Sequence, residues 1–274
     1  MNRNNKQIAT GDRSKHIRVA MRILITNDDG VHARGLEVLE EIARVLSDDI
    51  WVVAPETDQS GVSHSLSLND PLRLREIGPR HFAVKGTPTD CVIIGTRHVI
   101  PDGRPDLVLS GVNRGRNAAE DVTYSGTVAG AIEGTVLGIP SFALSQAYAA
   151  ATRKDPHWDT ARKFAPDLIR RVLADGMPRD VFVNINFPDC PPAQVRGVAV
   201  TCQGKRDQEL LRIEPRYDGR GNPYYWIAFE RNRPLSDRDG TDLSALADNR
   251  IAVTPLRLDM TDEPFMTRLA ELLG

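Results

Sequence analysis

One stretch constrains the fold more than any other, because an apolar run, a helical repeat and a second apolar run follow one another within it. Residues 22–26 form a short apolar run bounded by turn residues, which is typical of a buried parallel strand. Apolar residues at helical spacing from Leu36 to Leu46 predict an amphipathic helix that ends near Ser47. Residues 50–54 are the next predicted strand. A strand, a helix and a strand in this order predict a βαβ unit of a parallel α/β sheet.

The same alternation continues along the chain. Strands are predicted at 106–110 and 139–144, with a helix rich in small residues at 127–137 between them. A further helix is predicted at 87–99, behind a proline that favours a first turn. Residues 63–77 alternate apolar and polar side chains with period two, which predicts an exposed β-hairpin or a long strand.

The C-terminal part contains more extended structure. Strands are predicted at 181–186, 195–201 and 251–255, and a final helix at 264–273. Two extended runs around the sequence DGRGNP predict a long β-hairpin. Tyr224, Tyr225 and Trp226 place much of the chain's aromatic surface on this arm. Two interpretations stay open: the arm contacts another subunit, or it packs on its own domain.

Composition excludes some partners. The 274 residues are enough for one large or two small domains, at roughly 150 residues each. Lys and Arg (35) nearly balance Asp and Glu (37), so the net charge of −2 disfavours a polyanion-binding surface over the whole protein. Aromatic residues make up only 5%, which disfavours a base-stacking platform. We therefore expect no nucleic-acid polymer as a partner.

Cysteine usage and the N-terminus indicate a cytoplasmic protein. Cys91, Cys190 and Cys202 lack metal-binding spacing, which is typical of reduced thiols. No apolar run approaches the ~20 residues needed to span a bilayer, so no membrane partner is expected. Residues 1–20 are polar and basic, without the apolar core of a signal peptide. They are predicted to be a disordered extension, and 21–274 a single domain.

Polar side chains follow three of the predicted strands. They are Asn27, Asp28 and Asp29 after the first strand, the loop 55–61 after the second and the loop 110–117 after the third. The carboxyl ends of parallel strands meet at one edge of the sheet, where ligands bind in such folds. Carboxylates, a hydroxyl and an amide carbonyl form the oxygen set that Mg²⁺, Mn²⁺ or Ca²⁺ prefers. A cation would also offset the repulsion between adjacent carboxylates.

Helix capping is the alternative explanation of the aspartate pair. An Asp that follows a strand often caps the next helix, and here the next predicted helix begins near Gly35. Three polar strand ends occurring together favour the cation over the cap.

A second feature is the sequence YSGTVAGAIEG, in which residues 125–127 precede the small-residue helix. The N-terminus of a helix offers free backbone N–H groups and the positive end of the helix dipole, which suit a phosphate. Asn117 can donate from the loop before it, and Arg114 or Arg116 can supply charge. The alternative is an ordinary Ser/Thr cap followed by small residues that let the helix pack closely on the sheet.

A cation beside an anion-binding helix end indicates phosphoryl chemistry, with the metal polarising a phosphoryl oxygen and activating a water. The chain has no GxxxxGK[ST] and no GxGxxG after its first strand, which disfavours triphosphate-driven work and hydride transfer. A metal-assisted phosphomonoester hydrolase is the function that these residues support best.

Two other features are weaker. His64 is a candidate general acid, although a surface histidine is the simpler interpretation. The sequence SDRDGTD at 236–242 is similar to a calcium loop, but an EF-hand register would place Leu235 and Leu246 where acidic ligands belong. A turn that caps a helix from Asp242 is therefore favoured there.

Five segments, in chain order, resemble the SurE family of stationary-phase survival proteins: MRILITNDDGVHARGL, PETDQSGVSHSLSL, KGTPTDCV, PDLVLSGVNRGRNAAEDVTYSGTVAGAIEG and TDLSALADNRIAVTPL. The resemblance runs from Met21 to about Thr261. It implies a Rossmann-like, mostly parallel sheet with helices on both faces. It also implies a homodimer or homotetramer built partly by exchange of a C-terminal β-hairpin, which here is the arm at about 207–233.

The resemblance implies the site residues as well. The implied metal ligands are Asp28, Asp29, Ser60 and Asn113, and the first two are also the implied catalytic pair. The implied phosphate-binding residues are Asn117, Ser125, Gly126 and Thr127. The implied cofactor is one divalent cation per subunit, Mg²⁺ or Mn²⁺, with Ca²⁺ able to occupy the site.

Members of this family are metal-dependent 5′/3′-nucleotidases. The expected substrates are therefore nucleoside 5′- and 3′-monophosphates, with short polyphosphate as a side substrate. Metal-activated water is the expected nucleophile, and direct attack by Asp28 or Asp29 is the competing mechanism. The adjacent aspartates lack the DxD spacing of aspartyl-phosphate enzymes of the haloacid-dehalogenase type, which weakens that alternative. A nucleotide-sensing module that binds metal and phosphate without turnover is the alternative function.

Overall fold

The computed structural model describes residues 21–101, 103–206, 211–229 and 239–274. The predicted extension at 1–20 and parts of the predicted arm lie outside these residues. The strands are β1 (Ile23–Thr26), β2 (Ile50–Pro55), β3 (Arg73–Gly78), β4 (His81–Lys85), β5 (Leu107–Arg114), β6 (Ser141–Gln146), β7 (Val181–Phe187), β8 (Val198–Val200), β9 (Leu211–Tyr217), β10 (Pro223–Phe229) and β11 (Ile251–Arg257). The helices are α1 (Arg34–Leu46), α2 (Pro88–Ile94), α3 (Gly126–Val136), α4 (Trp158–Asp175), α5 (Asp242–Ala247) and α6 (Glu263–Leu273). None of these described helices has the length and apolar character needed to cross a membrane.

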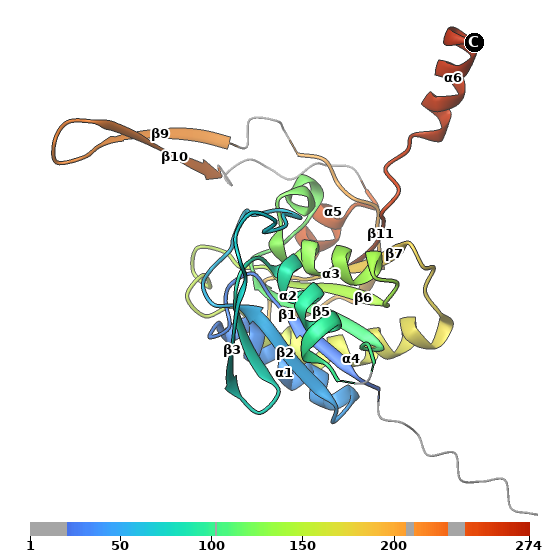
Figure 1. The fold of residues 1–274 in the computed structure, drawn as a ribbon. Coiled ribbons are helices and arrows are strands. Elements are labelled where there is room, and N and C mark those ends of the chain that lie inside the picture. The colour runs from blue at the N-terminus through green and yellow to red at the C-terminus, as the bar shows by residue number, and fades with distance from the viewer. Residues whose placement is uncertain (1–20, 102, 207–210, 230–238) are drawn as a thin grey trace, which may run out of the picture.

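Strand β1 lies where the strand order of the sheet reverses. The described residues form a nine-stranded sheet in the order β3-β4-β2-β1-β5-β6-β7-β11-β8 (Figure 1). The strands from β4 to β7 are parallel, whereas β3 and β11 run antiparallel to their neighbours β4 and β7. Because β2 and β5 lie on opposite sides of β1, the carboxyl ends of β1 and β5 form the switch point where ligands bind in such sheets. The predicted α/β fold is confirmed.

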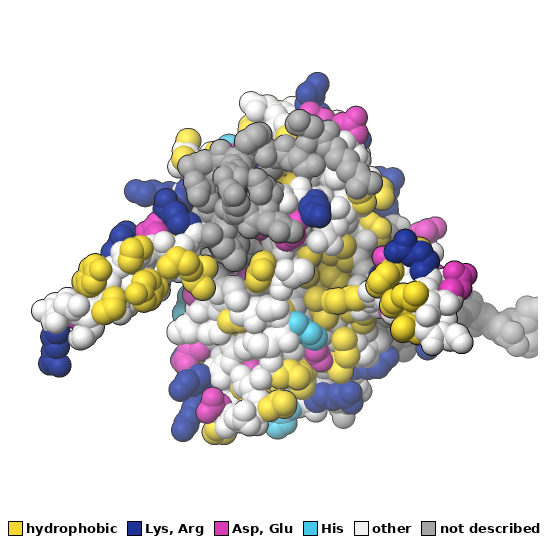
Figure 2. Space-filling model, turned by 90° about the horizontal axis from the view of Figure 1, so that it is seen from above, with side chains coloured by type: hydrophobic (Ala, Val, Ile, Leu, Met, Phe, Trp, Pro, Cys, Tyr) yellow, Lys and Arg dark blue, Asp and Glu magenta, His cyan; other side chains and the backbone are white. Residues whose placement is uncertain are grey.

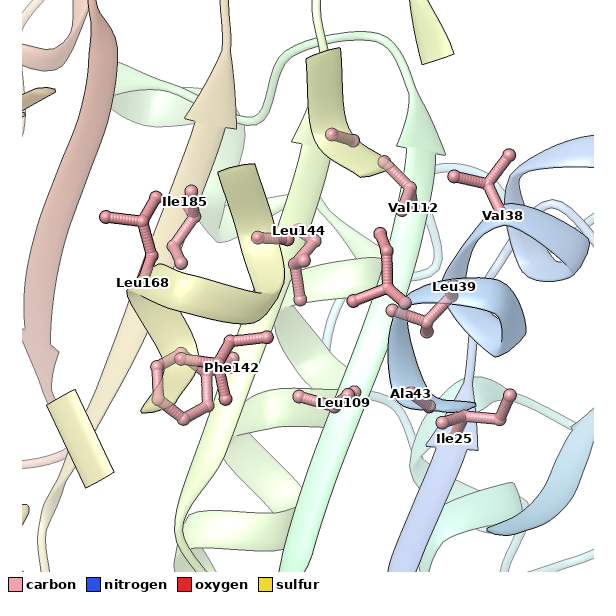
Figure 3. Packing of buried hydrophobic residues seen from close by; sticks show 14 of the residues in the cluster. Ile25, Val38, Leu39, Ala43, Leu109, Val112, Phe142, Leu144, Leu168 and Ile185 are labelled. Carbon is pink, nitrogen blue, oxygen red and sulfur yellow. The ribbon is translucent and has the colours of Figure 1, made fainter. Parts of the chain in front are cut away.

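Helices cover both faces of the sheet, and each face has its own core (Figure 1). Helices α1 and α4 pack on one face, and α2 and α3 pack on the other. In β1, Ile25 faces the first core, while Leu24 lies in the second with Val92 of α2. Figure 3 shows the first core, in which Leu39 of α1 lies with Ile25 and with Leu109 of β5. Burial on both faces is why the central strands are continuous apolar runs in the sequence.

Helix α4 is absent from the predicted elements. Pro166 lies inside it, and a proline in an otherwise helical pattern usually indicates the end of a helix. Two of the α4 residues that pack on the core, Ala161 and Ala165, are also small, so they give a weak hydrophobic signal in the sequence. The helical spacing of Ala161, Ala165 and Leu168 is the signal that could have predicted α4. Packing against α1 stabilises the helix despite its internal proline.

The prediction of a hairpin or long strand over 63–77 is wrong for its first half. Only Arg73–Gly78 is a strand, and it pairs with β4. The preceding loop bonds instead to the start of α2. The hydroxyl of Thr87 donates to the Ser65 carbonyl at 2.8 Å, and the Ser67 N–H donates to Asp90 Oδ1 at 3.1 Å. These bonds satisfy backbone groups that a neighbouring strand would otherwise bind.

The predicted hairpin is present as β9 and β10, which pair antiparallel in a separate two-stranded sheet. It projects from the body of the molecule (Figure 1), and Figure 2 shows hydrophobic side chains along its upper surface. Tyr225 and Trp226 are 63% and 61% exposed. The interpretation that this arm packs on its own domain is therefore wrong, and its contact with another subunit stays a prediction.

The close approach of α1 to β5 depends on Gly35. A Cβ atom added there would lie 1.9 Å from the Val112 carbonyl oxygen. We expect Gly35→Ala to lower the free energy of unfolding by roughly 1–3 kcal/mol, because overpacking outweighs the better helix propensity of alanine. Urea unfolding followed by circular dichroism measures this change.

The matched control is Gly219→Ala, in the hairpin turn, where an added Cβ would meet nothing within 4 Å. That variant should stay within about 0.5 kcal/mol of the parent, as surface substitutions usually do. Equal stability of the two variants would contradict the packing role of Gly35.

Candidate active site

Asp28 and Asp29 follow β1 directly, at the switch point of the sheet. Asn27 Nδ2 donates to the Gly30 carbonyl at 2.9 Å and closes the turn after the strand. Asp28 is only 4% exposed, and Asp29 is half-buried. Burial, followed by the charge of Asp29, raises the pKa of Asp28 to about 7. Burial also raises the pKa of Asp29. The pair therefore binds protons more tightly than exposed carboxylates do.

Helix α3 begins against Asp28. The hydroxyl of Thr127 donates to Asp28 Oδ1, and hydrogen bonds from Thr127 lower the pKa of Asp28 against the effect of burial. A Cβ atom added to Gly126 would lie 2.7 Å from Asp28 Cβ, so glycine is what allows this approach. Asp28 is therefore the anion nearest to the positive end of the α3 dipole.

Asp29 is held from the neighbouring strand. Its Oδ2 accepts the backbone N–H of Arg114, at the end of β5, at 3.0 Å. After burial, the nearby charge of Asp58 is the other contribution that raises its pKa, while Arg114 lowers it. Neither aspartate caps α1, because the N-cap residue of that helix is Ala33 and no side chain bonds to it. The capping explanation is wrong.

The loop after β2 carries Ser60 to the same place. The Gln59 N–H donates to the Asp28 carbonyl at 2.8 Å, and the Ser60 N–H donates to Asp58 Oδ1 at 2.7 Å. Asn113 stands near the end of β5, and its Nδ2 donates to the Gly115 carbonyl at 2.9 Å. That bond leaves the Asn113 Oδ1 atom as an acceptor. Both residues line a cleft of about 210 Å³ together with Asp28 and Asp29.

This set of donors fits a hard divalent cation. Two carboxylates with raised pKa values, a serine hydroxyl and an amide oxygen converge on one cleft, and such oxygen ligands suit Mg²⁺ or Mn²⁺. Asn27 Oδ1, in the residue before the pair, is buried without a hydrogen-bond partner among the described residues. No group of three or more His, Cys, Asp or Glu side chains in the described part of the chain is arranged to hold a metal. A cation here therefore depends on the mixed set.

The predicted phosphate-binding residues divide into two groups. Asn117 and Ser125 line the cleft. The Ser125 hydroxyl also caps α3, because it accepts the Val128 N–H at 3.0 Å, so the capping interpretation holds for this side chain. Gly126 and Thr127 lie behind Asp28 and contact it instead of lining the cleft. Their direct contact with a phosphate stays a prediction.

Comparison with known proteins identifies the family. The family model described as "Survival protein SurE" matches residues 23–210. The chain belongs to the SurE family. The resemblance of the five sequence segments to this family is thereby confirmed.

Relatives with curated names cover nearly the whole chain. The protein "5'-nucleotidase SurE" of Bradyrhizobium sp. (strain ORS 278) is 65% identical over 255 residues, which are 93% of this chain and 100% of the relative. The protein of the same name from Rhodopseudomonas palustris (strain TIE-1) is 67% identical over 256 residues, with the same coverage of both chains. The crystal structure of the SurE protein from Aquifex aeolicus superposes with a TM-score of 0.78 at 39% identity, covering 92% of this chain and 100% of that one.

Other residues that the sequence analysis did not single out also line the cleft. They include Tyr148 and Arg153. Tyr148 and Arg153 come from the loop after β6, whose carboxyl end lies at the same edge of the sheet as that of β5. The rule that ligands bind beyond the carboxyl ends of parallel strands therefore predicts a fourth loop at the site.

The weaker sequence features lie elsewhere. His64 Nε2 lies 2.9 Å from Glu133 Oε2 and lines an apolar groove, not the cleft. The simpler interpretation of His64 as a partly exposed histidine is therefore favoured. The helix predicted from Asp242 is α5, and Thr241 caps it; residues 236–238 lie outside the described part.

The raised pKa of Asp28 predicts a pH-dependent cost in stability for the metal-free protein. The folded state binds a proton at Asp28 more tightly than the unfolded state between pH 3.8 and about 7. Binding of this proton therefore contributes to the free energy of unfolding. The contribution is fully present below pH 3.8 and is lost as the pH rises to about 7. The free energy of unfolding of Asp28→Asn relative to wild type should therefore rise by roughly 2–4 kcal/mol over this range.

Urea unfolding of both proteins in the presence of chelator, from pH 4.5 to 8, measures this difference. Taking the difference cancels the titration of carboxylates that do not interact with Asp28. A difference that does not change with pH would show that burial of Asp28 carries no such cost.

Proposed function

We propose that this chain is a metal-dependent phosphomonoesterase that hydrolyses nucleoside 5′- and 3′-monophosphates, with short polyphosphate as a side substrate. The observation that carries the proposal is the buried Asp28–Asp29 pair at the switch point, in a cleft with a hydroxyl and an amide oxygen. The name 5′-nucleotidase of relatives 65–67% identical over nearly the whole chain supports the 5′ activity.

Four residues would hold one divalent cation per subunit, Mg²⁺ or Mn²⁺, with Ca²⁺ able to occupy the same place: Asp28, Asp29, Ser60 and Asn113. When bound, the cation polarises phosphoryl oxygens and lowers the pKa of a bound water. Asp28 and Asp29 must lose their protons to bind it, so the apparent metal affinity increases as the pH rises through the raised pKa values.

The part of the cleft that carries Asn117 and Ser125 would bind the phosphate. Asn117 and Ser125 supply polar atoms there, and Arg114 and Arg153 supply positive charge, which strengthens hydrogen bonds to phosphate oxygens. Gly126 and Thr127 are proposed to contact the phosphate as well, from the start of α3, where both also contact Asp28.

Water is the proposed nucleophile. An oxygen of Asp28 accepts the Thr127 hydroxyl, and Oδ2 of Asp29 accepts the Arg114 N–H. Each carboxylate is therefore already held by a hydrogen bond, which suits a ligand better than a group that must turn to attack phosphorus.

Assembly and location belong to the proposal too. The exposed aromatic arm, with Tyr225 and Trp226, supports a homodimer or homotetramer built through that hairpin. A cytoplasmic location agrees with the three cysteines, all of which are free.

The decisive experiment is phosphate release from 5′-AMP and 3′-AMP by chelator-treated protein, with and without added Mn²⁺ or Mg²⁺. We expect metal to restore release in wild type. Asp29→Asn should lose roughly 100-fold or more, because removing even an outer partner of a metal ligand typically costs 10–100-fold.

Asp155→Asn is the matched control, because Asp155 lies near Asp29 in a neighbouring hollow but does not line the cleft. It should keep nearly full activity. Folded wild type that binds AMP tightly with metal but releases no phosphate would instead support the nucleotide-sensing module.

A further inference from the structure

Two amides are buried on β7 beneath the cleft, where a strand covered on both faces normally carries apolar side chains. Asn184 and Asn186 are fully buried. They lie on the same face of the strand as Phe182, which packs against α3. Burying an amide without hydrogen bonds is unfavourable, so the hydrogen-bond partners of these two side chains need an explanation.

Both side chains bond to the backbone of one distant residue, Asn117. Asn186 Oδ1 accepts the Asn117 N–H at 2.8 Å, and Asn186 Nδ2 donates to the Asn117 carbonyl at 3.1 Å. Asn184 Nδ2 donates to the same carbonyl at 2.8 Å. The side-chain amide of Asn186 thus bonds to both backbone groups of Asn117, as the backbone of a neighbouring strand would.

The side chain of Asn117 is held from the next strand. Its Nδ2 donates to Ser145 Oγ at 3.0 Å, and Ser145 of β6 is the register partner of Asn186 of β7. Residues 115–118 belong to no helix or strand. The sheet therefore fixes this wall of the cleft through three buried polar side chains.

Stability alone does not explain the arrangement. Asn184 Oδ1 is buried without a hydrogen-bond partner among the described residues, a cost that an apolar side chain would avoid. Unsatisfied polar groups that persist at a core position are typical of functional sites. Asn117, which receives these bonds, lines the cleft four residues after Asn113.

We infer that Asn184, Asn186 and Ser145 are positioning residues that hold Asn117 at the wall of the cleft for the phosphate group of a phosphomonoester. This inference rests on the proposed function. It separates the phosphate wall, held from β6 and β7, from the cation ligands, held from β1, β2 and β5. Disturbing the first should weaken phosphate binding and leave metal binding in place, since a shift of about 1 Å in a positioning group is enough to reduce turnover strongly.

The test compares Asn186→Leu and Ser145→Ala with a matched control, Thr254→Val. Thr254 is buried on β11 opposite Asn184, and its hydroxyl bonds to Thr201 at 2.7 Å, away from Asn117. The control therefore removes a buried hydrogen bond from the same sheet without touching the cleft. Each protein is assayed for KM and kcat with 5′-AMP, inhibition by inorganic phosphate, Mn²⁺ binding by calorimetry and melting temperature.

In Asn186→Leu, KM and the phosphate inhibition constant should rise about 10-fold, and in Ser145→Ala about threefold, with the Mn²⁺ Kd within about twofold of wild type. Thr254→Val should lower the melting temperature and leave KM unchanged. If Asn186→Leu does not fold, Ser145→Ala decides. Phosphate constants unchanged in folded variants, or changed equally in Thr254→Val, would overturn the inference.

The two proposals fail differently. If wild type releases no phosphate with any metal, the proposed function fails. The positioning role would then be tested by measuring how much inorganic phosphate with Mn²⁺ raises the melting temperature. A rise in wild type that is smaller in Ser145→Ala and unchanged in Thr254→Val would still support the positioning role. No rise in any of the three proteins would overturn it.

Discussion

The burial of two neighbouring carboxylates is the constraint on which the rest of the site depends. Asp28 and Asp29 follow β1 at the switch point of the sheet, and burial raises the pKa of both. Two surrounding groups limit the cost by donating hydrogen bonds to the carboxylates: the Thr127 hydroxyl of α3 to Asp28, and the Arg114 N–H of β5 to Asp29. Neither of these donors cancels a full charge, so the pair is poised for a cation in a way that a capping aspartate is not.

The close packing of α3 follows from the same pair. The helix must bring its N-terminus against Asp28, and its small residues make that approach possible. A Cβ atom added to Gly126 would lie 2.7 Å from Asp28, and one added to Gly130 would lie 2.7 Å from Ser110. A larger side chain at either position would therefore push the helix away from the sheet. The two interpretations of YSGTVAGAIEG are therefore not exclusive. The small residues serve helix–sheet packing, and that packing places the end of α3 at the site.

The sequence predicts most of the fold because burial on both faces of the sheet makes the central strands apolar runs, as in β1 and β5. It also predicts that Asp28, Asp29, Ser60 and Asn113 share one cleft, because strand ends meet at one edge. Sequence pattern is a poorer guide to secondary structure where contacts between distant segments determine the conformation. Pro166 obscures α4, although the spacing of its buried residues is helical. The loop before β3 bonds to α2 instead of to a strand. The bonds from Asn184 and Asn186 to Asn117 span 67 and 69 residues, and no local pattern encodes them.

The sheet also sets the distance between the two halves of the proposed site. The cation ligands stand after β1, β2 and β5, while the wall with Asn117 is tied to β6 and β7 through Ser145 and Asn186. Because adjacent parallel strands have a fixed spacing, the pairing of β5, β6 and β7 limits the separation between the proposed cation ligands and Asn117. A phosphate bound by the cation on one side and by the Asn117 wall on the other is oriented without contacts to the sugar or base. A broad substrate specificity, for different nucleosides and for 5′ and 3′ phosphates, is the expected consequence.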